Sequence, residues 1–414
     1  MAIVSYPNLT FEERTGESGE RLIRCRLLTR YFFDIPASEL ERLGTLLIRK
    51  DELEFPDASE KTVVNKFGRL LEDGLARKLV NSLTGKPTFY LTAESGVPLI
   101  SSNEFGVVDR GSNILELKPL TGCNFNCVYC SVDEGKNQKR YDYLVEKDYL
   151  VSVAAEVAAT KTHPVECNIG PHGEPLLYPE IVELVRELQE IPNVAIISVN
   201  TNGSLLSKRL VDDLAAAGLT RINLSLPALD EKLASELAGI PSFPLTHLLE
   251  MVAYAKTRLN VLLAPVLIPG KNDGEMLQIV ELSKSITSDY PTIGIQNYLE
   301  YPRGRKPVKR ELPWEEFYAF LKELEEKSGK SLTATKEEFH IHDENELGKP
   351  FRKGDVVDAV VVMPGRYPGE VYAAAEGRAI NVQVPGASEP VGKRVRVTIV
   401  RDKHNIFKGV VGKR

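Results

Sequence analysis

Residues Thr121-Gly-Cys123-Asn-Phe-Asn-Cys127-Val-Tyr129-Cys130 decide how this chain is interpreted, because they gather three cysteines within eight positions. The C-x3-C-x2-C spacing follows directly on the strand-like run Ile114-Leu-Glu-Leu. Iron–sulfur cubanes are normally held by four thiolates, so three ligands would leave one iron open. Structural zinc needs four protein ligands, and no fourth Cys or His lies near this loop. The segment therefore predicts a [4Fe–4S] cluster held by Cys123, Cys127 and Cys130.

The length of the chain and its cysteines limit the number of domains and the cellular compartment that we expect. The 414 residues, 43% hydrophobic and 27% charged, are typical of two or three globular domains. Five cysteines are an odd number for a disulfide framework, and a tight group of three is typical of a metal site in a reducing compartment. We expect a cytoplasmic protein without a membrane span, because the sequence has no long apolar run and no basic, apolar leader.

Charge is distributed unevenly along the chain. Residues 350–414 hold twelve Lys or Arg against six Asp or Glu, a net of +6. The whole chain carries −6, which leaves −12 on the remainder. A basic C-terminal module on an acidic body favours an anionic partner.

Apolar runs alternate with amphipathic stretches from about residue 112 to residue 328. Strands are expected at 114–117, 165–169, 194–199, 221–226, 261–268 and 293–299. Helices are expected at about 147–160, 179–188, 208–217, 230–238, 245–258, 275–286 and 314–326. Strict alternation predicts a parallel sheet covered by helices, and six strands are too few for an eight-stranded barrel. We therefore expect an α/β fold, a partial (three-quarter, six-stranded) βα barrel with its site at the carboxyl ends of the strands.

Two smaller regions flank the expected barrel. Before it, helices over Ser38–Leu47 and Ser59–Leu79 and a hairpin reaching Thr88 indicate an α+β region, either winged-helix-like or a structural cap. After it, short strands separated by glycines at 356–362, 370–374, 379–384 and 394–399 indicate an OB-like β-barrel. The expected domains are 1–105 (α+β region), 106–328 (partial barrel), 329–350 (linker) and 351–414 (β-barrel).

The cysteine loop resembles the signature of the radical S-adenosylmethionine (radical SAM) superfamily, including an aromatic residue, here Tyr129, before the last cysteine. The resemblance covers about residues 112–328. It implies a [4Fe–4S] cluster whose open iron binds S-adenosylmethionine. An electron from a donor such as ferredoxin or flavodoxin would then release methionine and a 5′-deoxyadenosyl radical that attacks an unactivated C–H bond.

Four further elements follow in the family's order, each at the end of a predicted strand. Gly170-Pro-His-Gly173-Glu174-Pro resembles the Gly-Gly-Glu element that holds the methionine amino group. Glycine lets a carbonyl approach a ligand closely, and a carboxylate suits an ammonium. Asn202 lies in an Asn-Gly turn, Ser225 stands where family members contact the ribose, and Ile268 belongs to the adenine-side element. The resemblance thus implies cofactor contacts from Tyr129, Gly173, Glu174, Asn202, Ser225 and Ile268.

The C-terminal segment resembles a TRAM domain, a small β-barrel found on RNA-modifying enzymes. The resemblance rests on Lys353-Gly-Asp-Val-Val, Asn381 to Gly386, Gly392-Lys-Arg-Val-Arg-Val-Thr-Ile and Phe407-Lys-Gly. A basic barrel of this kind can hold a phosphate backbone. RNA, with tRNA as the expected class, is therefore the predicted partner. The candidate contacts are Lys393, Arg394, Arg396, Arg401, Lys403 and Lys408.

Sequence alone identifies no catalytic residue beyond the cofactor site. TRAM-bearing methylthiotransferases carry three more cysteines before the barrel, but only Cys25 precedes residue 123 here, which argues against sulfur insertion through a second cluster.

Cys167, in the second predicted strand, could face the barrel interior as a catalytic group or lie in the core, where free cysteine is common. Four residues after the last strand could clamp a nucleotide or pack the linker: Tyr298, Tyr301, Arg303 and Arg305.

Three functions remain open at this point. The first is a radical SAM enzyme that functionalises a C–H bond of a nucleotide in structured RNA. The second is a radical SAM enzyme acting on a small molecule or cofactor precursor. The third is an RNA-binding protein with a structural cluster, which the ordered cofactor elements disfavour. The fold analogy indicates the first chemical step but neither the target nor the group installed.

Overall fold

A six-stranded sheet lies at the centre of the computed structural model, which describes residues 1–135, 139–170, 172–386 and 390–412. Its strand order is β15, β14, β13, β12, β10, β9, and all neighbours are parallel except β9, which runs antiparallel to β10. The strands are β9 (Gly106–Asp109), β10 (Ile114–Lys118), β12 (Val165–Ile169), β13 (Val194–Thr201), β14 (Arg221–Leu224) and β15 (Asn260–Leu263). The five parallel strands are among the six expected of the partial βα barrel; the antiparallel edge strand β9 was not predicted, and the expected strand 293–299 is not part of this sheet.

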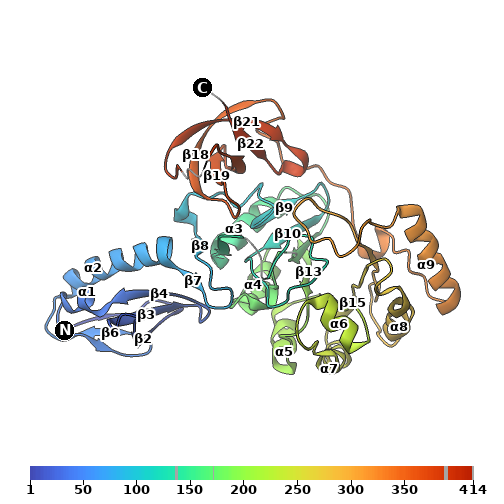
Figure 1. The fold of residues 1–414 in the computed structure, drawn as a ribbon, viewed down its shortest axis with the longest axis horizontal. Helices are drawn as coiled ribbons and strands as arrows, with labels where there is room; N and C mark the ends of the chain where they lie inside the picture. The colour runs from blue at the N-terminus through green and yellow to red at the C-terminus, as the bar shows by residue number, and fades with distance from the viewer. Residues whose placement is uncertain (136–138, 171, 387–389, 413–414) are drawn as a thin grey trace.

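Helices cover the outside of this sheet, as Figure 1 shows. They are α3 (Lys147–Ala158), α4 (Ile181–Gln189), α5 (Lys208–Ala217), α6 (Glu231–Ala238), α7 (Leu245–Ala255) and α8 (Asp273–Ser283). Helix α5 illustrates why they form where predicted: the Ser207 hydroxyl accepts from Leu210 N–H, and Gly218 ends the helix with φ +101°. None of the described helices has the length and apolar character needed to cross a bilayer.

The last two expected strands of the partial barrel, 261–268 and 293–299, differ from the prediction. The expected strand 261–268 is divided into β15 and a two-residue strand, β16 (Val266–Leu267), because Pro265 has no N–H for the sheet ladder. The expected strand 293–299 is reduced to a bridge at Ile293 and to β17 (Gln296–Asn297), which pairs with β16. Helix α9 (Trp314–Ser328) then ends the barrel at this side.

The two faces of the sheet differ in polarity. Leu115 on β10, like Cys167 and Ile197 beside it, is fully buried in the hydrophobic core under the helices. The alternate residues, which face the barrel interior, are polar and bond to one another. Arg221 Nη2 lies 2.6 Å from Glu166 Oε1. Amide and hydroxyl bonds continue this network through Asn168, Ser198, Asn200 and Asn223.

The N-terminal region contains more strand than the sequence interpretation allowed. One antiparallel sheet has the order β2 (Leu9–Thr15), β3 (Arg21–Leu27), β4 (Tyr31–Pro36), β7 (Val80–Asn81). A second has the order β1 (Ala2–Val4), β6 (Leu53–Phe55), β5 (Leu47–Ile48). Residues 1–36 are thus four strands that were not predicted. These sheets, rather than two helices and a hairpin, make up most of the region.

Of the two helices expected in this region, the first is shorter than predicted and the second is present. The one over Ser38–Leu47 is only α1 (Ala37–Glu41), because the chain turns at Gly44, whose φ of +150° few other residues adopt. The second is present as α2 (Glu60–Asp73) and a following turn over Gly74–Lys78. The predicted hairpin is present but short: Val80 and Pro87 form an antiparallel bridge, and Thr88 N–H donates to Leu79 O at 2.7 Å. Strand β8 (Thr88–Leu91) also pairs in parallel with β11 (Asp142–Val145).

The C-terminal region is a closed five-stranded β-barrel, consistent with the expected OB-like fold. Its strand order is β18 (Val356–Pro364), β19 (Glu370–Ala375), β20 (Arg378–Gln383), β22 (Lys408–Val411), β21 (Arg394–Arg401). Strand β22 was not predicted as a separate strand. The barrel sits over β9 and β8 (Figure 1), with Phe407 and Val361 fully buried inside it. Residues 413–414 of the expected domain lie outside the described residues.

Candidate active site

A cavity of about 590 Å³ lies at the carboxyl ends of the central strands, where the cysteine loop follows β10. It brings together the three predicted cluster ligands and five of the six predicted cofactor residues. These are Cys123, Cys127, Cys130, Tyr129, Gly173, Glu174, Asn202 and Ser225. Ile268 is fully buried and does not line the cavity, whereas Val266 does. The structure therefore places Val266, and not the Ile268 side chain, in the cavity wall.

The cysteine loop presents its sulfur atoms as separate ligands. Phe125 N–H donates to Cys123 Sγ and Glu134 N–H donates to Cys130 Sγ, both at 3.3 Å. Among the residues that the structure describes, no three His, Cys, Asp or Glu side chains converge on one metal ion. Three thiols are one ligand short of a closed structural zinc site. They do fit a cubane, in which each thiolate binds its own iron.

Burial also bears on what the cysteines can bind. It raises the pKa of the Cys127 thiol to about 12 and that of Cys123 well above its usual range. Isolated thiols of this kind are protonated at neutral pH, so thiolates here require a positively charged centre. Iron supplies such a centre, and its binding would release the thiol protons.

Arg305 holds the cysteine loop from the opposite side of the barrel. Its Nη1 donates to Cys127 O at 2.7 Å, and its Nη2 donates to Asn126 Oδ1 at 2.7 Å and Glu134 O at 2.6 Å. Its Nε lies 2.6 Å from Asp133 Oδ1. The guanidinium is therefore committed to the loop, and the interpretation of Arg305 as a nucleotide clamp is not supported. Sequence offered no signal for this contact, because Arg305 lies far along the chain from the loop.

Gly173 and Glu174 join the second strand end to the cysteine loop. Gly173 has φ +66°, and a Cβ there would lie 2.3 Å from Gly122 O, so only glycine fits. Glu174 is buried, and its carboxylate accepts bonds from Thr201 Oγ1 at 2.6 Å, Asn202 N–H at 2.8 Å and Leu176 N–H at 3.0 Å. Burial raises the pKa of Glu174, and these bonds act in the opposite direction. Pro171 of this element lies outside the described residues.

Gly173→Ala is expected to impair the site through this contact. A methyl group 2.3 Å from Gly122 O must push the two loops apart, and alanine is strained at φ +66°. We expect a loss of about 2–4 kcal/mol in unfolding free energy and weaker S-adenosylmethionine binding, both measurable by urea titration and calorimetry. Gly274→Ala is the control, because that glycine lies in α8 with open space around its Cα, so alanine should stabilise slightly.

Asn202 and Ser225 complete the cavity at the next two strand ends. Asn202 Nδ2 donates to Asn124 Oδ1 at 2.9 Å, and its Oδ1 accepts from Ser204 N–H at 3.0 Å. Ser225 is partly buried and held by its N–H, which donates to Thr201 O at 2.9 Å. Its hydroxyl forms no hydrogen bond with another described residue, so it is available to a ligand.

Cys167 lies away from the cavity. It is fully buried in the hydrophobic core under the helices, and burial raises the pKa of its thiol to about 12. The interpretation of Cys167 as a core residue therefore fits, and the catalytic one does not. Cys25 is likewise buried in the N-terminal core.

The six predicted RNA contacts fall into two groups. Lys393, Arg394, Arg396 and Lys403 are exposed on the C-terminal barrel and line neither cavity, while Arg401 is exposed and Lys408 is partly buried. The other two, Arg401 and Lys408, are cross-strand partners on β21 and β22 and line a second cavity between the two barrels.

Comparison with known proteins agrees with this site. The sequence profile of the radical SAM superfamily matches residues 117–283. An uncharacterized protein of Methanocaldococcus jannaschii is 34% identical over 401 residues, which cover 90% of this chain and 91% of that protein. The GTP 3′,8-cyclase of Limosilactobacillus fermentum is 32% identical over 172 residues, 39% of this chain and 48% of the cyclase. The match thus spans about half the length of that cyclase.

Solved structures give a weaker likeness. The crystal structure of Streptococcus suis SuiB bound to S-adenosylmethionine superposes with a TM-score of 0.42 at 16% identity, over 78% of this chain and 70% of that one. The profile match covers the cysteine loop and the cavity residues from Gly173 to Val266, and the remaining lining residues, from Gly294 onward, lie beyond it. Residues 117–283 therefore form a radical SAM domain, and the chain is a radical SAM enzyme that uses a [4Fe–4S] cluster and S-adenosylmethionine.

Proposed function

We propose that this enzyme functionalises a C–H bond of a nucleotide in structured RNA, with tRNA as the substrate class. The observation that carries the proposal is the closed C-terminal barrel packed beside the cysteine loop. We take it to be a TRAM-like domain at residues 351–414, after a linker at 329–350 and the partial barrel at 106–328. RNA held on such a barrel would lie next to the catalytic cavity.

A basic ridge on this barrel supports an RNA partner. Lys393, Arg394 and Arg396 are exposed at the start of β21, and the two arginines leave the same face of the strand. Arg396 forms a 3.5 Å pair with Asp358 in which both side chains are exposed, a kind of pair that contributes little and can exchange for phosphate. Lys403 adds an exposed cation in the turn before β22. Exposed cations of this kind suit a phosphate backbone.

The cavity supplies the chemistry in this proposal. We assign Cys123, Cys127 and Cys130 as cluster ligands, with ferredoxin or flavodoxin as the reductant. The cofactor residues are then Tyr129, Gly173, Glu174, Asn202 and Ser225, while Ile268 supports them from the core. A reduced [4Fe–4S] cluster held by these cysteines, with S-adenosylmethionine bound beside it, would supply a 5′-deoxyadenosyl radical, with methionine as the other product. The chain's own residues exclude water and orient the target C–H bond.

Neutralising the ridge is expected to weaken tRNA binding and its dependence on salt. In the triple variant Lys393→Gln, Arg394→Gln, Arg396→Gln, each lost phosphate contact should lower the slope of log K against log salt by about 0.7–0.9. We expect affinity to fall at least about tenfold at 0.1 M salt, as measured by filter binding. The matched control removes three exposed cations from α2, namely Lys61→Gln, Lys66→Gln and Arg69→Gln, and should bind as wild type. Equal binding by both variants would contradict the proposal.

A second candidate follows from the partial match to GTP 3′,8-cyclases. On this alternative the enzyme acts on a free purine nucleotide, and the C-terminal barrel covers the substrate. GTP-dependent formation of 5′-deoxyadenosine, with no effect of tRNA, would favour this candidate over RNA.

A further inference from the structure

A second cavity, of about 530 Å³, lies where the C-terminal barrel covers the open edge of the partial barrel beside β9 and β10. We call it the inter-barrel chamber. Ser131, Val132 and Tyr301 line both this chamber and the cysteine cavity, and Ser131 directly follows Cys130. Its volume is within the roughly 300–1,000 Å³ range of small-molecule sites. The chamber is therefore of ligand size and adjoins the place where the cofactors act.

Two buried polar atoms in the chamber wall lack a partner. Ser101 Oγ and His172 Nδ1 form no hydrogen bond with the described residues, although the two residues are only 3% and 4% exposed. Native proteins seldom leave such atoms unpaired, because each costs about 1–3 kcal/mol. Ser101 also has φ +84°, a strained conformation that tends to occur at ligand sites. Burial lowers the pKa of His172, so its imidazole is neutral and one of its nitrogens can accept a hydrogen bond.

The chamber wall contains several cations, most of which are paired with carboxylates. Two carboxylates, Glu104 and Glu116, are outnumbered by six cations among the described lining residues: Arg110, Lys118, Lys139, Arg303, Arg401 and Lys408. The first four already contact carboxylates, through Glu116, Glu134 or Glu370.

Arg401 and Lys408 form no ion pair with any described residue. Burial lowers the pKa of Lys408; the guanidinium groups of Arg303 and Arg401 lower it further, while the carboxylates of Glu370 and Glu104 raise it. An anion bound between Arg401 and Lys408 would relieve this repulsion.

The chamber also offers a ring surface. Tyr301 is 47% exposed and lies at the junction with the cysteine cavity. Tyr367 is already covered by Arg303, whose guanidinium lies 4.0 Å from the ring centroid. An exposed tyrosine beside a cationic pair is the arrangement that stacks a base while its phosphate is held nearby.

We infer that the inter-barrel chamber is the substrate site, and that it binds one phosphorylated nucleoside. Arg401 and Lys408 hold the phosphate, Tyr301 stacks on the base, and Ser101 and His172 bond to its polar groups. This inference rests on the proposed function, because in RNA the bound unit is a nucleotide turned out of its stack. The same chemistry is presented by a free nucleotide.

Binding of the four ribonucleoside 5′-monophosphates to the full-length protein tests the inference. We expect at least one of them to bind, and the double variant Arg401→Gln, Lys408→Gln to raise its Kd by about 10- to 100-fold, because two charge-assisted bonds are lost. The control Arg352→Gln, Lys353→Gln removes two exposed cations from the same barrel outside the chamber and should leave Kd unchanged. Equal Kd values for wild type and the chamber variant would overturn the inference.

Photocross-linking gives a second readout that needs no variant. 4-Thiouridine 5′-monophosphate, and tRNA containing 4-thiouridine, should label the peptides of Tyr301 or Tyr367. Labelling confined to α9 or to the N-terminal sheets would overturn the inference. Failure of tRNA to bind, with nucleotide binding that depends on Arg401 and Lys408, would instead contradict the RNA substrate and leave the chamber assignment standing.

Discussion

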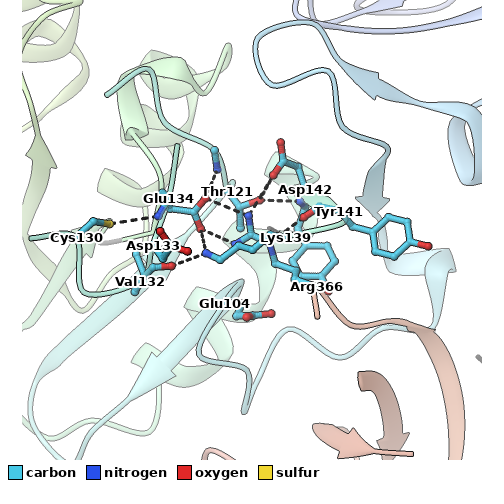
Figure 2. Close-up of polar contacts among 12 residues, drawn as sticks. Glu104, Thr121, Cys130, Val132, Asp133, Glu134, Lys139, Tyr141, Asp142 and Arg366 are labelled. Carbon is cyan, nitrogen blue, oxygen red and sulfur yellow. Dashed lines mark hydrogen bonds and ion pairs between the residues drawn. The ribbon is translucent and has the colours of Figure 1, made fainter. Parts of the chain in front are cut away.

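Replacing Arg366 with methionine is expected to destabilise the protein by about 3–5 kcal/mol, since it leaves buried carboxylates without their partner. Arg366 lies in the turn between β18 and β19 and is fully buried. Its Nη1 and Nη2 lie 2.5 Å and 3.0 Å from the two oxygens of Glu134, and Nη2 lies 3.1 Å from Asp142 Oδ1 (Figure 2). Its Nε donates to Tyr141 O at 2.8 Å.

The effect should reach the cysteine loop as well as the fold. Glu134 N–H donates to Cys130 Sγ at 3.3 Å, and Glu134 Oε2 accepts from Gly122 N–H at 3.2 Å, so Arg366 fixes a residue that contacts both ends of the loop. We expect the variant to lose iron faster on desalting. Lys139, which lies 2.8 Å from Glu134, is a second cation at this carboxylate and should limit the loss.

Urea unfolding of Arg366→Met and of a matched variant, Arg378→Met, checks this prediction. Arg378 is partly buried in the same barrel; among the described residues its guanidinium bonds to two backbone carbonyls and to no carboxylate. Its replacement should cost about 1 kcal/mol or less. The double variant Arg366→Met, Glu134→Gln should recover part of the loss, because one unpaired charge is removed. Equal destabilisation by Arg366→Met and Arg378→Met would show that the buried pairs are not what matters.

Cys127→Ala is expected to abolish both cluster assembly and formation of 5′-deoxyadenosine. With two thiolates left, a cubane has too few protein ligands to persist. Iron and sulfide content after anaerobic reconstitution, together with the visible absorbance of the cluster, measure the first effect. Cys167→Ala is the control: it removes a fully buried thiol from the core, away from the cavity, and should retain the cluster at a cost of about 1–2 kcal/mol in stability. Normal iron content in the Cys127 variant would refute the ligand assignment.

Prediction from sequence succeeded where a local pattern determines the structure. The strand of Val165–Ile169 and the helix opened by Ser207 follow from apolar runs and a capping serine, and both are present. The strand of Tyr31–Pro36 also carried a readable signal, since Tyr31, Phe33 and Ile35 alternate with more exposed residues. This strand could therefore have been predicted from the sequence.

Other features had no local signal. The contact of Arg366 with Glu134 spans 232 positions, and the contact of Arg305 with Cys127 spans 178. Single arginines in loops have no periodicity, so only the fold shows that they hold the cysteine loop and not RNA. The residues of the cofactor cavity were easier to predict from the sequence, because short motifs at successive strand ends must meet at one edge of a parallel sheet. The prediction that Ile268 lines the cavity was wrong because the position of a residue in a motif does not determine which way its side chain points.

The most direct test of RNA modification by this enzyme is to measure the formation of 5′-deoxyadenosine with and without tRNA. The full-length protein would be reconstituted anaerobically, reduced with dithionite and given S-adenosylmethionine, with tRNA from the source organism in one arm and GTP in another. If the enzyme modifies tRNA, we expect tRNA to stimulate formation of 5′-deoxyadenosine strongly, and the Arg401→Gln, Lys408→Gln variant to lose that stimulation. A fully reconstituted protein that forms 5′-deoxyadenosine at the same rate with and without tRNA would contradict the RNA-modifying account.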